Sequence, residues 1–126
     1  MSNFQIILQI IILSIIFLSI DSLYLSQIAP VFTQMLKGIT GGKTMSLDPI
    51  ATLKTYALLV FGIWYFIISR NSSLVDAFLY GATVYGVYEL TNKATIPGWD
   101  WSFVAIDTLW GGILHVLVTY VYRLVY

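Results

Sequence analysis

The chain has 126 residues, of which 59% are hydrophobic and 10% charged, and its six basic and six acidic residues cancel. Soluble domains are about 25% charged, so this composition predicts a single integral membrane domain, residues 1–126, with the lipid bilayer as its solvent. The balanced charge gives no attraction to nucleic acid. Cysteine is absent, which excludes disulfides, thiol catalysis and Cys-ligated metals.

Four stretches are long enough to cross a bilayer whose hydrocarbon core, about 30 Å thick, requires about 20 helical residues. We expect these spans at about residues 4–28, 50–69, 74–91 and 102–124. The first stretch has no Lys or Arg ahead of it, so we interpret it as an uncleaved span rather than a secretory signal, and we expect it to end before Pro30.

The starts of the later helices carry capping signals. Asp48 precedes a proline that suits the first helical position, and Asp100 stands before the last span. Ser73 and Asp76 have the spacing of a capping box, with Asp in place of the usual Glu.

The three connections differ in length and composition. In the first, Phe32, Met35, Leu36 and Ile39 recur at helical spacing and predict a short interfacial helix. The second, residues 70–73, is so short that its flanking helices must be antiparallel neighbours. The expected fold is therefore all-α: a polytopic, up-down-up-down bundle of four transmembrane helices with both termini on the same side.

Orientation follows from the positive charges beside the spans. The side of the first and third loops holds Lys37, Lys43, Lys54 and Lys93, whereas the other side holds Arg70 and Arg123. By the positive-inside rule, and by a margin of two charges, the termini are predicted to be non-cytoplasmic.

Three acidic residues fall inside the predicted spans. Asp21 lies near the end of the first, Glu89 near the end of the third and Asp107 near the start of the fourth. Chain direction brings all three into the same half of the membrane, about 5–10 Å below the interface at 1.5 Å per helical residue. We therefore expect a polar site there.

An intramembrane charge costs about 2.5–3.5 kcal/mol on insertion scales, so these acids must be protonated, hydrated, paired with lysine or hydrogen-bonded by aromatic and amide side chains. Tyr85, Glu89 and Asn92 share one helix face, as do Asp107 and Trp110. The candidates for binding an ion or ligand are Asp21, Tyr85, Glu89, Asn92, Asp107 and Trp110, supported by Lys54, Tyr88, Thr91, Lys93 and Trp99.

His115, the only histidine, lies near the middle of the last span. It could relay protons, since its unperturbed pKa is about 6.5, but a neutral, packed histidine is the favoured interpretation. One histidine and scattered acids show no metal-ligand spacing, so we expect neither a metal nor a cofactor.

Two parts of the sequence, the segment from Tyr88 to Gly111 and "IDSLYL" in the first span, together form a recognisable pattern. It resembles the signature of a family of small bacterial membrane proteins catalogued as a domain of unknown function, which implies four spans and no established activity. Glu89 stands where the family usually has aspartate, and Tyr24 where it usually has tryptophan. The matching positions are Asp21, Tyr88, Glu89, Leu90, Thr91, Asn92, Ala94, Thr95, Trp99, Asp107, Trp110 and Gly111.

Three functions fit these observations. The first is binding or transport of a cation, proton or small solute, because intramembrane acids mark such pathways; a pore through so small a bundle would require a homo-oligomer. The second is an enzyme or binder that acts on a lipid headgroup, although no nucleophile motif supports catalysis. The third is a structural scaffold, such as a viral membrane protein, in which the acids hold the helices together.

Overall fold

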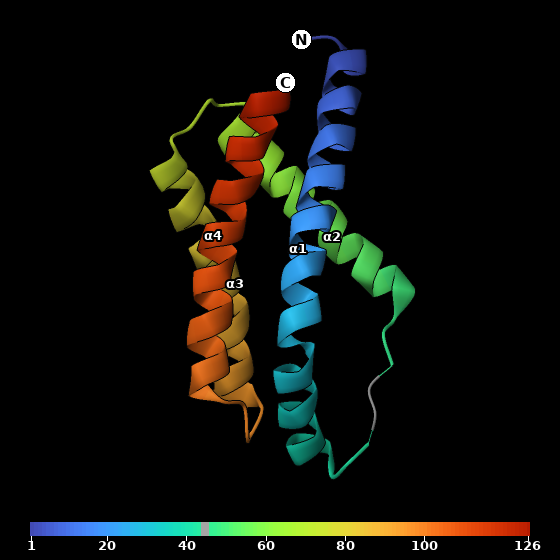
Figure 1. The fold of residues 1–126 in the computed structure, drawn as a ribbon, viewed down its shortest axis with the longest axis vertical. Helices are drawn as coiled ribbons and strands as arrows, with labels where there is room; N and C mark the ends of the chain where they lie inside the picture. Colours follow the sequence, from blue (N-terminus) through green and yellow to red (C-terminus); the bar gives the residue numbers. More distant parts are fainter. Residues whose placement is uncertain (44–45) are drawn as a thin grey trace.

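A computed structural model describes residues 1–43 and 46–126; residues 44–45 of the predicted first loop lie outside the described part. The described residues form helices and no strand (Figure 1). The elements are α1 (Asn3–Thr40), α2 (Pro49–Ile63), the π-helical turn η1 (Trp64–Ile68), α3 (Leu74–Thr95) and α4 (Trp101–Val125).

The predicted N-cap residues are confirmed at the starts of three helices, but no hydrogen bond from the Asp76 side chain to the backbone of Ser73 completes the expected capping box in the described residues. The carboxylate of Asp48 accepts hydrogen bonds from the backbone N–H groups that open α2. The hydroxyl of Ser73 accepts from the backbone of Asp76 at the start of α3, and Asp100 caps α4. Each cap satisfies backbone donors that have no partner within the helix.

The prediction that the first span ends before Pro30 and that a separate interfacial helix follows is wrong. Pro30 lies inside α1, which continues to Thr40. Proline removes one helical hydrogen bond, and packing offsets this loss. The extra turns of α1 lie against a cluster at the α3–α4 turn, formed by Trp99, Phe103 and Val104 and covered by Ile28, Phe32, Met35, Leu36, Ile39 and Ile96.

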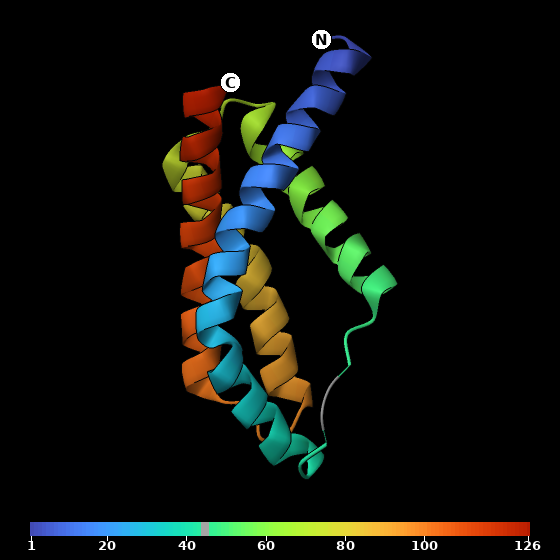
Figure 2. The ribbon, with the colours of Figure 1, turned by 45° about the vertical axis from the view of Figure 1, so that its right-hand side comes forward.

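Helices α3 and α4 form the closest pair in the structure. A Cβ atom added to Gly81 would lie 2.2 Å from the carbonyl oxygen of Gly111, so neither helix could approach this closely with a larger residue there. Helix α1 packs along α4, whereas α2 meets α1 at its later turns and diverges toward its start (Figures 1 and 2). Both chain termini lie at one end of the molecule, and the α3–α4 turn lies at the other (Figure 1).

Among the described residues, three helical segments are long and apolar enough to cross a membrane: Asn3–Thr40, Pro49–Ile68 and Trp101–Val125. Helix α3 is long enough to cross a membrane, but it is less apolar than the other three segments. Many large apolar side chains on all four helices are exposed, such as Ile15, Leu58 and Leu79. This surface is typical of a protein that contacts lipid.

Candidate functional site

Asp21 is buried between three helices, with 4% of its surface exposed. One carboxylate oxygen accepts a hydrogen bond of 2.6 Å from the hydroxyl of Tyr56 on α2, and the other accepts one of 3.0 Å from the indole N–H of Trp110 on α4. The carboxylate of α1 therefore joins α1 to both α2 and α4.

Asp107 on α4 is in turn bonded by a side chain of α1. It accepts a hydrogen bond of 3.1 Å from the hydroxyl of Tyr24 on α1. The ring of Tyr24 stacks on that of Trp110, with ring centroids 4.4 Å apart. Asp21 and Asp107 are thus held on either side of one aromatic pair.

Glu89 brings α3 into the same group and is completely buried. Its Oε1 atom accepts a hydrogen bond of 2.9 Å from the indole N–H of Trp99, whereas its Oε2 atom receives none from the described residues. Glu89 and Asp107 are neighbouring acids on the closely packed helices α3 and α4. A hydrogen bond between two carboxyl groups would require a proton on one of them.

We call Asp21, Glu89 and Asp107 the carboxylate site. The side chains that donate hydrogen bonds to it are two tyrosines and two tryptophans, all of them neutral. Lys54 is exposed, and the ammonium of Lys93 lies over the ring of Trp101, 5.3 Å from its centroid. Among the described residues, therefore, no side chain that donates a hydrogen bond to these carboxyl groups carries a positive charge.

The remaining candidates surround the site at different depths. Tyr85 is half-buried and packs on Gly111 and beside the ring of His115. Asn92 is half-buried one turn beyond Glu89. Tyr88 is 56% exposed, and the hydroxyl of Thr91 donates to the backbone of its own helix, so these two side chains lie outside the site.

Two hydrogen-bond donors of the site were not among the residues expected from the sequence. Tyr24 lies three residues after Asp21 and therefore on the same helix face. Tyr56 lies two turns from the start of α2, at the depth already inferred for the acids. A search of each span for tyrosine at that depth would have found both.

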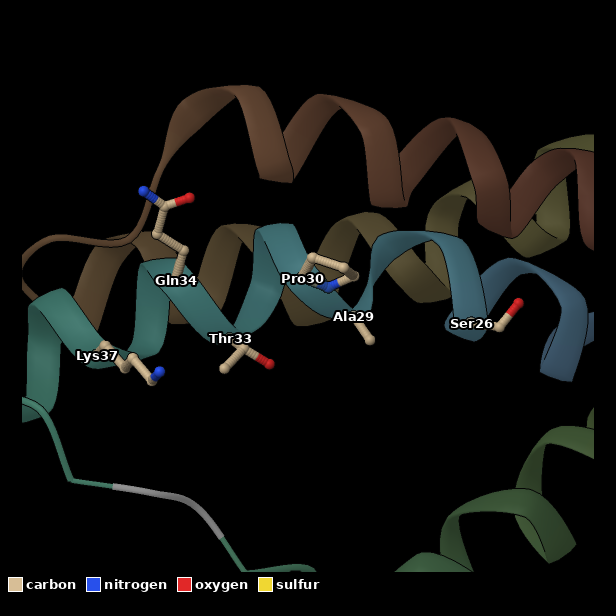
Figure 3. Close-up of a pocket in the computed structure, with 6 residues that line it drawn as sticks. All are labelled: Ser26, Ala29, Pro30, Thr33, Gln34 and Lys37. Atoms are coloured by element: carbon tan, nitrogen blue, oxygen red, sulfur yellow. The ribbon is translucent and has the colours of Figure 1, made fainter.

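A hollow on the surface lies away from this site. It has a volume of about 540 Å³ and follows one stretch of α1. Figure 3 shows Ala29, Thr33 and Lys37 along one side of that helix, with Gln34 turned away from them. None of its lining residues belongs to the carboxylate site. Within residues 1–43 and 46–126, no group of three or more acidic or histidine side chains has the geometry of a metal site.

The apolar helices and the polar group enclosed by them define a helical membrane protein. Residues 6–123 match the model of a family described as "Predicted membrane protein (DUF2177)", and the chain belongs to that family. No curated protein and no solved structure matches the chain.

Proposed function

We propose that the protein is a multi-pass membrane protein whose carboxylate site binds a proton or a small monovalent cation within the bilayer, as a step in moving it. In this arrangement all four helices cross the membrane in alternating directions, with α3 shielded from lipid on the side where it packs against α4. Both termini then lie on one side, which the distribution of lysine and arginine assigns to the non-cytoplasmic face.

The observation that carries the proposal is the burial of three carboxyl groups whose hydrogen-bond donors are all neutral. Isolated charges in a bilayer are costly, and intramembrane acids commonly mark ion and proton pathways. Glu89 and Asp107 are neighbouring buried acids on packed helices, and two such carboxyl groups can share one proton, so we place the exchange point between them.

A purely structural role would use these groups differently. Interhelical hydrogen bonds in membrane proteins contribute about 0.6 kcal/mol on average, and amides or hydroxyls supply them without ionisation. Two neighbouring buried acids must also be kept from ionising together, and the free energy this requires counts against the small gain from their hydrogen bonds. The Glu89–Asp107 pair therefore favours binding over a scaffold function.

The test is thermal unfolding of the detergent-purified protein across a pH range and with added lithium, sodium or potassium chloride. If a shared proton links Glu89 and Asp107, stability falls as the pH rises far enough to remove that proton. If a cation replaces the proton, that cation restores stability at high pH, by about 2.7 kcal/mol at a concentration of 100 times its Kd.

Glu89→Gln is the informative variant, because an amide can donate to Asp107 without a proton from solution. It should lose both the pH dependence and the cation response. Asp76→Asn, at the exposed start of α3, is the matched control and should behave as the wild type. A flat wild-type response, with Glu89→Gln only less stable, would assign the site to helix packing alone.

A further inference from the structure

His115 lies at the centre of the helix bundle and is completely buried. Its Nδ1–H donates a hydrogen bond of 2.8 Å to the carbonyl oxygen of Gly111, one turn earlier in α4. The rings of Phe17 on α1 and of Tyr80 and Tyr85 on α3 contact it edge-on. The Nδ1 bond fixes the tautomer of the neutral ring, so that Nε2 is an acceptor.

Two buried polar atoms at this level have no hydrogen-bond partner among the described residues. They are Nε2 of His115 and the hydroxyl oxygen of Thr119. A buried polar atom without a hydrogen-bond partner is energetically unfavourable. Residues four apart are neighbours on a helix, with Cβ atoms about 5–6 Å apart, so these two unpartnered side chains lie next to each other along α4.

The two residues belong to a polar line along the buried face of α4. Asp107, Gly111, His115 and Thr119 follow one another at intervals of four residues, and all four are buried. Each interval advances about 6 Å along the helix axis. The line begins at the carboxylate site and runs toward the end of the molecule where both termini lie (Figure 1).

We propose that His115 Nε2 and the Thr119 hydroxyl hold a water molecule and form a second proton-binding position, between the carboxylate site and the terminal end of the bundle. This inference rests on the proposed function, because a second proton-binding position on α4 is of use only if the carboxylate site exchanges protons. The hydroxyl of Thr119 suits both states of the ring, since it can donate to neutral Nε2 or accept from protonated Nε2–H through the water.

The proposed step is a reversible proton transfer between the water molecule and Nε2 of His115. A proton carried by the water moves to Nε2 and gives an imidazolium, while the Nδ1–H bond to Gly111 remains. The proton then leaves from the same Nε2 atom to the water, and no electrons are exchanged. His115 is therefore a transient holding position rather than a relay that passes the proton through its ring.

The ionisable groups on the packed elements are few. Helix α3 contributes Tyr80 and Tyr85. Helix α1 contributes Phe17 at the contact and Asp21 one turn further on, and Tyr56 of α2 lies behind Phe17. On α4, Asp107 lies two turns away. The carboxylate site is thus the nearest source of negative charge to a protonated His115.

Because the chain has one histidine, nitrogen-15-histidine labelling gives the imidazole signals of His115 alone. The wild-type Nε2 resonance should show a nitrogen that accepts a hydrogen bond. Thr119→Val, which replaces the hydroxyl by a methyl group, should shift that resonance. Thr108→Val is the matched control, because Thr108 also has a buried, unpartnered hydroxyl on α4 but packs beside Gly86 instead. An Nε2 resonance that is the same in Thr119→Val and wild type would overturn the proposal.

Proton flux into vesicles that contain a pH dye supplies the second measurement. Flux above that of empty vesicles should fall about tenfold in Thr119→Val and His115→Phe, equivalent to about 1.4 kcal/mol in the barrier, and should be unchanged in Thr108→Val. Flux that Thr119→Val leaves at the wild-type rate would reject the route, as would the absence of wild-type flux. Binding at the carboxylate site is tested separately, by the pH-dependent stability that Glu89→Gln should remove. The proposal for the carboxylate site and the proposal for His115 can therefore be rejected independently.

Discussion

Tyr24 and Trp110 stack with their ring planes 5° apart, and each donates a hydrogen bond to the acid on the other's helix. Tyr24 lies three residues after Asp21, and Trp110 lies three residues after Asp107. The same acid-to-aromatic spacing on α1 and α4 therefore produces a reciprocal pair of bonds. A shift of α1 by one turn along α4 would break the stack and both bonds together, so this arrangement fixes the register of the two helices.

Tyr24→Phe tests the reciprocal pair, because phenylalanine keeps the stack on Trp110 and removes only the hydroxyl donor to Asp107. We expect a loss of about 0.6–1.7 kcal/mol in the free energy of unfolding, the range from average to largest for interhelical hydrogen bonds in a membrane protein. Reversible unfolding in mixed detergent micelles measures it. Tyr88→Phe, at an exposed tyrosine on α3, is the control and should change stability little. Equal effects from both variants would contradict the assignment of the bond.

The bond from Tyr56 to Asp21 should couple α2 to the site. In a double-mutant cycle, Tyr56→Phe and Asp21→Asn should each destabilise the protein, and the double variant should lose less than the sum of the two. The expected coupling is about 0.5–2 kcal/mol, since residues that share a hydrogen bond are not independent. Strict additivity would mean that the 2.6 Å contact contributes nothing to stability.

The sequence was sufficient to predict the helices that follow residue 48 and the residues that cap their starts, because these depend on local spacing and on helix length. The donors to the acids were harder to assign. Trp110 and Trp99 were candidates, whereas Tyr24 and Tyr56 were not, because a tyrosine in a membrane span is equally consistent with contact to lipid headgroups. Which face of a uniformly apolar helix turns inward depends on its neighbours.

The continuation of α1 past Pro30 could not be predicted for a related reason. Local rules place a helix end before proline, and only the cluster at the α3–α4 turn reverses that expectation. The spacing of Phe32, Met35, Leu36 and Ile39 predicts one apolar helix face. It does not show that this face packs on Trp99 and Phe103 rather than on the membrane surface.

Gly81→Ala should separate α3 from α4. The added methyl group would meet the Gly111 carbonyl oxygen and the ring of His115, at 2.2 and 2.5 Å. Overpacking of this kind costs about 1–3 kcal/mol, and thermal unfolding in detergent should show it. Gly38→Ala on α1 is the control, because nothing lies within 4 Å of the added atom, and it should be neutral or slightly stabilising. Similar unfolding midpoints for the two variants would contradict the close approach of α3 and α4.

Phe32→Ala should release the part of α1 that follows Pro30. The ring of Phe32 stacks on Phe103, with centroids 5.2 Å apart, and meets Trp99 edge-on, so it is the main link between these turns and the α3–α4 turn. With the proline already removing one backbone bond, the turns beyond it depend on this packing. Hydrogen–deuterium exchange should therefore quicken for the amides of residues 33–40 and stay unchanged in the first half of α1. Val31→Ala removes a neighbouring side chain that is 51% exposed, and it should leave the exchange rates as they are. If Phe32→Ala leaves the protection of residues 33–40 intact, the turns of α1 beyond Pro30 are stable without the packing of Phe32 on the α3–α4 turn, and the prediction is wrong.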